Sequence, residues 1–119
     1  MQITKFGQSI KLIDGATAAG AGAGRPGHLN AIFQAILTGA SGALHATVDI
    51  ETTEEDETVV DADAHWEWLA TFELTVANWA GTADDDFGSF LQSPGLGRVR
   101  GNVTLITGTG AKATLLMGV

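Results

Sequence analysis

The chain has 119 residues, enough for one domain with a buried core and too few for two. It contains no cysteine, so disulfides, thiolate nucleophiles and cysteine-ligated metals are excluded. The formal net charge of −8 argues against binding to nucleic acid or an anionic membrane, because both require clustered Lys and Arg. We therefore expect a single domain with no nucleic-acid partner and no membrane partner.

Charge is unevenly distributed along the chain. Residues 26–97 contain thirteen acids and no Lys or Arg, whereas both ends are basic. The acidic run 51–57 is typical of a solvated loop, with a bound cation as the less common alternative. No apolar run reaches the length of a membrane span, and Asp14 interrupts the stretch that most resembles a signal peptide. We expect a mature, soluble protein.

Residues 1–28 are predicted to form an amino-terminal arm or connector with minor strands near residues 2–6 and 10–13. Within it, residues 14–28 are nearly all small, and they offer almost no large side chain that would anchor them to a core. A flexible connector, or an arm ordered only by a neighbouring molecule, fits this composition. The basic residues of the arm, among them Arg25, are candidates for contact with a partner.

The next segment, residues 31–37, fits both a strand and a helix, because its apolar residues also satisfy helical spacing. We favour a strand, since residues 38–42 then form the glycine turn of a hairpin with residues 44–52. In that second strand, apolar and polar residues alternate strictly. The alternation predicts a buried face made of Leu44, Ala46, Val48 and Ile50.

Residues 66–76 alternate in the same way, with Glu67 and Glu73 among the outward residues. The expected inner face consists of Trp66, Trp68, Ala70, Phe72, Leu74 and Val76. Two interpretations of the tryptophans are open. They are core or subunit interface, because they share a face with apolar residues, or they are an exposed platform for sugar rings.

The remaining segments complete an all-β pattern. Residues 84–86, three consecutive aspartates, are expected in an exposed turn, and a minor strand is expected near residues 87–92. Residues 98–107 predict a strand with Val99, Val103 and Leu105 on one face, and glycines 108 and 110 then lead into a hairpin with residues 111–117. Short strands separated by glycine turns predict a single-domain jelly roll or β-sandwich of about eight antiparallel strands over residues 29–119.

Catalytic and metal-binding patterns are weak. Three histidines, His28, His45 and His65, lie in different contexts without the paired spacing of a metal site. Glu67 and Glu73 would lie about 20 Å apart on one strand, too far for glycoside hydrolysis. We expect no enzyme activity, no cofactor and no metal.

The carboxy-terminal half, with Gly97-Arg-Val-Arg-Gly-Asn-Val-Thr104 and Leu105-Ile-Thr-Gly-Thr-Gly-Ala111, resembles small virion proteins of tailed bacteriophages. In that group a tryptophan-containing strand, a Gly/Asp loop, an arginine strand and an I-x-G-T-G-A hairpin follow in this order. Residues 31–39 and 46–51 match the same pattern, so the resemblance covers roughly residues 29–119. The best-fitting members are capsid decoration or cement proteins, which are trimeric jelly rolls on the capsid surface.

The resemblance implies a structural virion protein that binds the major capsid protein and stabilises the capsid as a homotrimer. Arg98 and Arg100 would then pair with Glu67 or Glu73 of a neighbouring subunit, although pairs within one chain are an equal alternative. A carbohydrate-binding or host-recognition module of a tail or fibre is the alternative function. The residues expected at the subunit or capsid interface are Arg25, Trp66, Glu67, Trp68, Glu73, Arg98 and Arg100.

Overall fold

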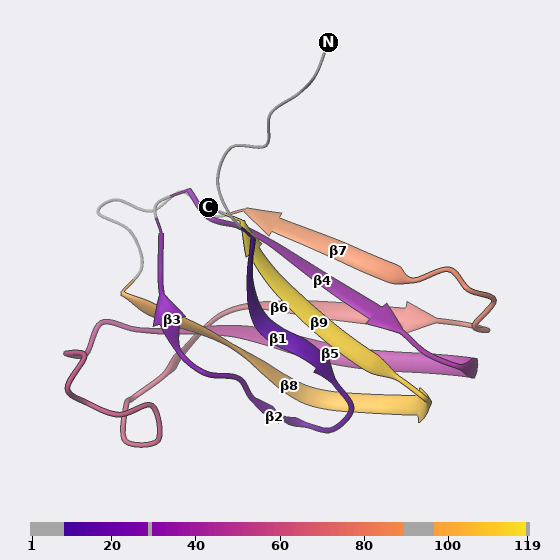
Figure 1. Cartoon of the computed structure of the whole chain (residues 1–119), viewed down its shortest axis with the longest axis horizontal. Coiled ribbons are helices and arrows are strands. Elements are labelled where there is room, and N and C mark those ends of the chain that lie inside the picture. Colours follow the sequence, from indigo (N-terminus) through magenta and orange to yellow (C-terminus); the bar gives the residue numbers. More distant parts are fainter. Residues whose placement is uncertain (1–8, 29, 90–96, 119) are drawn as a thin grey trace, which may run out of the picture.

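The computed structural model describes residues 9–28, 30–89 and 97–118, and all helix or strand structure in this part of the chain is β-strand. The strands form two antiparallel sheets packed face to face (Figure 1). This confirms the predicted all-β sandwich. The strands are β1 (Ser9–Ala16), β2 (Gly20–Ala21), β3 (Arg25–Pro26), β4 (Ile32–Thr38), β5 (Ser41–Thr53), β6 (Glu67–Val76), β7 (Asp84–Ser89), β8 (Arg98–Thr109) and β9 (Lys112–Gly118).

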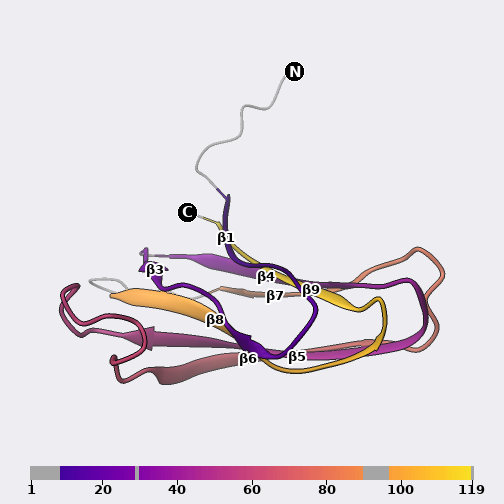
Figure 2. The same ribbon diagram turned by 60° about the horizontal axis from the view of Figure 1, so that its bottom comes forward.

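Sheet A has the strand order β1-β9-β4-β7, and sheet B has the order β2-β8-β5-β6, with β3 also paired to β8. Figure 2 shows the two sheets as two layers. The connections from β1 to β2, β4 to β5, β6 to β7 and β8 to β9 each carry the chain from one layer to the other. We call each of these strand pairs an arch. Because the arches follow the same order in both sheets, the sandwich is a row of four arches.

This topology corrects both predicted hairpins. Residues 31–37 and 44–52 are strands, but β4 pairs with β7 and β9, whereas β5 pairs with β6 and β8. Likewise β8 and β9 lie in different sheets. A short glycine turn suits a hairpin and an arch equally, so the sequence does not distinguish them. The two similar turns are neighbours in space, since the Ala40 amide donates to the Thr109 carbonyl at 3.0 Å.

The core between the sheets follows the predicted alternation. In β5, Leu44, Ala46, Val48 and Ile50 are all buried, as expected. Alternate residues of the neighbouring strands face them, and burial of these apolar side chains is the main stabilising contribution. Besides those of β5, the buried apolar side chains of β4, β6, β8 and β9 are Phe33, Ala35, Leu37, Phe72, Leu74, Val99, Val103, Ala113, Leu115 and Met117.

Two β-bulges break the alternation in sheet B. Ile50 pairs with Ala70, and the next residue, Glu51, pairs with Trp68. Leu69 is therefore an extra residue in β6. Thr104 is the corresponding extra residue in β8. Each bulge moves the residues beyond it to the opposite face of the sheet. Trp68 and Leu105 therefore face outward, 65% and 41% exposed, so the face predicted for them from strict alternation is wrong.

Residues 9–28 belong to the sandwich, in contrast to the separate arm expected for residues 1–28. Strand β1 pairs with β9 and places Leu12 and Ile13 in the core. The small residues that follow are held by their backbone, because Gly22 and Gly27 donate to the carbonyls of Gly101 and Gly97 at 2.8 Å. A segment anchored in this way needs no large side chains. Residues 1–8, where the first minor strand was expected, lie outside the described residues.

Residues 84–86 also differ from expectation, since they open strand β7 and form no turn. Asp84 accepts a hydrogen bond from the Thr75 amide at 2.8 Å, and Asp85 accepts one from Gln34. The aspartates tolerate a strand here because β7 is the edge of sheet A and exposes them to solvent. The strand expected at residues 87–92 is described as far as Ser89, and its remainder lies outside the described residues.

Candidate functional site

The residues predicted at an interface are spread over the outer face and one end of sheet B. Arg98 and Arg100 lie on β8, Trp68 and Glu73 on β6, and each projects away from the core. Three others lie nearby: Trp66 precedes β6, the exposed Glu67 begins it, and the exposed Arg25 belongs to β3.

Trp66 forms a cluster with the two arginines of β8. The guanidinium carbon of Arg100 lies 4.3 Å from the centroid of the Trp66 ring, and that of Arg98 lies 5.6 Å from it. The Trp66 indole N–H donates to the Asp61 carbonyl at 3.0 Å. These contacts fasten the loop between β5 and β6 onto β8 by cation–π attraction and a hydrogen bond.

Both arginines are already paired with acids of the same chain. Arg98 Nη1 donates to Asp61 Oδ1 at 3.0 Å, and Arg100 Nε donates to Glu51 Oε1 at 2.7 Å. Their side chains are only 14% and 18% exposed. The pairs within one chain, left open by the sequence, are thus the ones found, and their acids are Asp61 and Glu51. Glu51 belongs to strand β5 and so does not lie in the loop expected for the acidic run.

Glu73 pairs with its own chain as well. His45 Nε2 and the Thr47 hydroxyl lie 3.0 and 3.1 Å from Glu73 Oε2, within hydrogen-bonding distance across the β5–β6 pair. These hydrogen bonds, that from His45 foremost, hold the pKa of the Glu73 carboxyl below its ordinary value of 4.5. Glu73 therefore contributes to holding the outer face of sheet B together.

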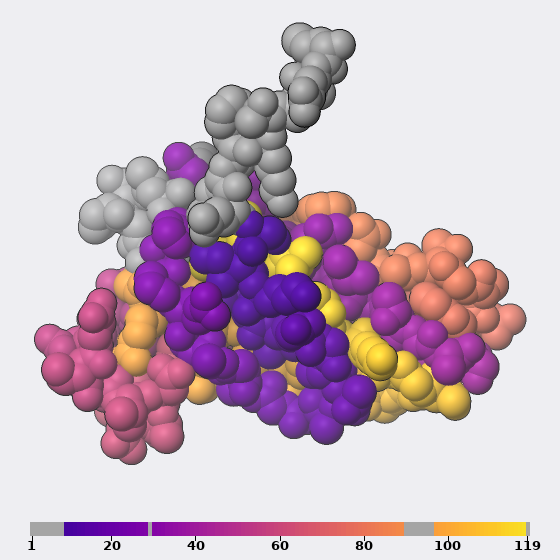
Figure 3. All heavy atoms as spheres, viewed as in Figure 1, coloured from indigo at the N-terminus to yellow at the C-terminus, as the bar shows by residue number. Residues whose placement is uncertain are grey.

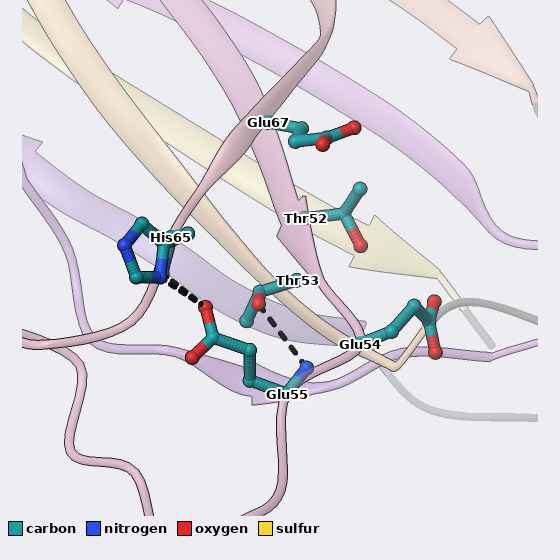
Figure 4. Close-up of a pocket in the computed structure, with 6 residues that line it drawn as sticks. All are labelled: Thr52, Thr53, Glu54, Glu55, His65 and Glu67. Carbon is teal, nitrogen blue, oxygen red and sulfur yellow. Dashed lines mark hydrogen bonds and ion pairs between the residues drawn. The ribbon is translucent and has the colours of Figure 1, made fainter.

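An acidic cleft of about 430 Å³ lies at the end of sheet B near the β5–β6 loop (Figure 4). Figure 4 shows the His65 ring turned toward Glu55, with Nδ1 2.9 Å from Oε1. The His65 amide also donates to this carboxylate, and that backbone hydrogen bond is the main cause of the lowered pKa of Glu55. The cleft is lined by Thr52, Thr53, Glu54, Glu55, His65 and Glu67.

The histidines do not come together with acids into a metal centre. His45 bonds to Glu73 and His65 to Glu55, and these two pairs lie on different segments. Across residues 9–28, 30–89 and 97–118, no group of three or more His, Asp and Glu side chains is close enough to share an ion. The acidic cleft is thus a region of negative charge without a formed ligand set.

The outer face of sheet A carries an apolar patch that the sequence analysis did not single out. Ile32 and Ile36 point outward from β4, and the register places Phe87 of β7 and Leu116 of β9 on either side of Gln34 between them. Ile32 and Phe87 are 54% and 62% exposed. The signal was present in residues 31–37, where Ile32 and Ile36 are the apolar residues that break strict alternation.

Trp79 and Trp68 have opposite environments. Trp79 is partly buried against the core, and its amide donates to the Gly42 carbonyl at 2.8 Å. Trp68 is 65% exposed, on a face whose other residues are mainly polar. Core packing therefore accounts for Trp79, and Trp68 is the tryptophan available to a ligand.

Comparison with known proteins found no matching family model, no matching curated protein and no matching solved structure. In the described residues there is no helix with the length and apolar character needed to cross a membrane.

Proposed function

We propose that this chain is a structural virion protein that decorates the outside of a bacteriophage capsid as a homotrimer. The apolar patch on the outer face of sheet A, formed by Ile32, Ile36, Phe87 and Leu116, is the observation that carries the proposal. Exposed apolar groups grouped on one face mark protein–protein contact surfaces. The resemblance of the sequence to capsid decoration proteins supplies the virion context.

As in a protein interface, the charged residues of the patch lie on its rim and its inner part is uncharged. Four apolar side chains surround Gln34, and Lys11, Lys112 and Asp85 lie on the same face around them. Figure 3 views the molecule from this side, with the segments of β1, β9, β4 and β7 following one another across the face. The patch spans three neighbouring strands, β7, β4 and β9, and it suits a second protein surface better than a small molecule.

The charges on the rim favour another copy of the chain as the occupant. Lys11 lies on β1 at one edge of sheet A, and Asp85 lies on β7 at the other edge. Lys11 also lies 3.4 Å from Asp14 of its own strand, and in a head-to-tail contact it would meet Asp85 of the next copy. Such contacts close into rings when the rotation permits. A trimer is a ring of this kind.

The other face of the sandwich suits exposure on a particle. The outer face of sheet B and the acidic cleft at its end carry Glu51, Glu55, Glu67 and Glu73. A surface rich in negative charge keeps assembled particles apart in solution. We therefore orient sheet A toward the neighbouring subunits and the major capsid protein, and sheet B toward solvent.

The first experiment measures absolute mass by light scattering. The chain weighs 12.3 kDa, and the proposal expects a species of about 37 kDa. Phe87→Asp, at an exposed position, places a charge in the patch and should give a monomer with an unchanged far-UV spectrum. Trp68→Ala, on the opposite face, is the matched control and should keep the trimer. A wild-type monomer at all concentrations would overturn the trimer.

Decoration itself is tested by co-sedimentation with mature heads of the phage that encodes the chain, stripped of decoration protein. Saturable binding by the wild type, lost in Phe87→Asp, is the expected result. Equal binding of both proteins would show that sheet A is not the capsid-facing surface, and no binding by either would refute the decoration role.

A further inference from the structure

A β-bulge in β6 turns Trp68 toward solvent. The extra residue Leu69 reverses the alternation of β6, so that Leu69 packs against the core and Trp68 points outward opposite Glu51. The exposed fraction of Trp68, 65%, is the largest of the exposed large apolar residues described. Bulges are often found where a side chain is re-aimed toward a functional surface.

The orientation of the Trp68 ring is fixed by hydrogen bonds. Its indole N–H donates to Thr71 Oγ1 at 2.7 Å, and the Thr71 hydroxyl donates to Asp49 Oδ1 at 2.7 Å. Both donors have defined acceptors, so the exposed ring is held in place before any ligand arrives. A ring already held in place loses little conformational entropy when a ligand binds.

Polar groups next to the ring have free hydrogen-bonding capacity. Asp49 is paired in register with Asn102 of β8, and both project from the outer face, two residues before Glu51 along β5. Among the described residues, neither Asp49 Oδ2 nor the side-chain amide of Asn102 has a hydrogen-bond partner. Asp49 is linked to the Trp68 ring through Thr71, and Asn102 lies beside Asp49 on the next strand, so a ligand on the ring can extend along this face to both groups.

The chemistry of this face matches a sugar ring better than a protein partner. Protein interfaces have apolar centres depleted of charge, as on sheet A, whereas Trp68 stands in a row with the ion pair of Glu51 and Arg100. A pyranose presents an apolar C–H face that stacks on an aromatic ring and a rim of hydroxyls that need donors and acceptors. One aromatic ring beside a carboxylate and an amide supplies both.

We propose that the outer face of sheet B binds a glycan, with a pyranose ring stacked on Trp68 and its hydroxyls hydrogen-bonded to Asp49 and Asn102. The site lies on the face opposite the apolar patch. It goes beyond the proposed decoration role, because a particle coated in this way would also attach to carbohydrate on a cell surface.

The test uses an array of bacterial lipopolysaccharides and capsular polysaccharides, followed by NMR titration of the ¹⁵N-labelled full chain with an oligosaccharide from the best-bound glycan. The expected result is a shift of the Trp68 indole N–H signal and of the Asn102 side-chain signals. We expect Trp68→Ala to weaken binding at least about tenfold and Asn102→Ala to weaken it severalfold. No binding to any glycan on the array overturns the proposal.

Phe87→Ala is the matched control, because it removes an aromatic ring of similar exposure from the opposite face. It should bind the glycan like the wild type, whether or not it trimerises. Equal glycan affinity of Trp68→Ala and the wild type would overturn the site. So would a lower mass of Trp68→Ala in light scattering, which would make Trp68 a protein contact. If the protein proves to be a monomer, the glycan titration can still be interpreted, because the two sites lie on opposite faces.

Discussion

Arg100 lies over the ring of Trp66, with its guanidinium carbon 4.3 Å from the ring centroid, and its Nε donates to Glu51. A planar guanidinium can stack and donate to a carboxylate at once, whereas an ammonium cannot. We expect Arg100→Lys to lower the free energy of unfolding by about 1 kcal/mol, measured by urea denaturation. Arg25→Lys, at an exposed position, should leave the midpoint unchanged. Equal midpoints for both variants would contradict this role of Arg100.

Asp61 connects three segments of the chain. Its carboxylate accepts from Arg98 and from the Gly24 amide at 2.7 Å, and its carbonyl accepts from Trp66. Among the described residues, Arg98 Nε and Nη2 are buried without a hydrogen-bond partner, so Asp61 is its charged contact. We expect Asp61→Asn to cost about 2 kcal/mol, below the cost of breaking a fully buried pair because Asp61 is 38% exposed.

Comparing Arg98→Met with Asp61→Asn separates the cost of an unpaired buried charge from the loss of packing. Arg98→Met removes the buried charge together with its need for a partner, and methionine can still pack against Trp66. Urea denaturation should therefore show a smaller loss for Arg98→Met than for Asp61→Asn. The reverse order would mean that the arginine contributes mainly through packing and its contact with the ring.

Gly101 of β8 lies close to Ile13 and Leu115 of the facing sheet. A Cβ at this position would be 2.6 Å from Ile13 Cγ1 and 2.8 Å from Leu115 Cδ2. We expect Gly101→Ala to destabilise the fold by about 1–3 kcal/mol, because core side chains must shift. Gly118→Ala is the control, since its nearest atom, the Ile32 carbonyl oxygen, is 3.6 Å away. If Gly101→Ala and Gly118→Ala lower the thermal unfolding midpoint by the same amount, the close approach at Gly101 is refuted.

The lowered pKa of Glu73 predicts a dependence of stability on pH. Its contribution is fully present above the unfolded value of 4.5 and is lost as the pH falls through the lower folded value. Glu73→Gln should therefore reduce the acid-side slope of the unfolding free energy below pH 4.5, measured by urea denaturation at several pH values. An unchanged slope would show that the hydrogen bonds from His45 and Thr47 do not favour the ionised form.

The sequence predicted local features of the fold better than long-range ones. Alternation identified β5 and the inner residues Phe72 and Leu74, because period two is a property of any half-buried strand. The bulges at Leu69 and Thr104 escaped detection, since an extra residue has no signature of its own in a run such as residues 66–76. As a result Trp68 and Leu105 were assigned to the wrong face.

Pairing between strands was not predictable for a different reason. The turns at residues 38–42 and 108–110 show where the chain reverses, but the choice between hairpin and arch depends on which face each strand buries across the whole sandwich. The pairing of β2 and β3 with β8 was hidden as well, because backbone hydrogen bonds from Gly22 and Gly27 leave no trace in side-chain pattern. Arg98 and Arg100 were identified as charged contacts, yet their acids, Asp61 and Glu51, come from positions fixed only by the fold.

The position of β9 constrains how this protein is made in the cell. It lies in the middle of sheet A, between β1 and β4, although it is synthesised after every other strand of the sandwich. Until residues 112–118 leave the ribosome, β1 has no partner strand in its sheet and β4 has one open edge. Open edges of this kind pair readily with other chains. We therefore expect the sandwich to form only after β9 has been made, and to fold slowly, in the range of milliseconds to seconds that is usual for sandwiches built from distant pairings.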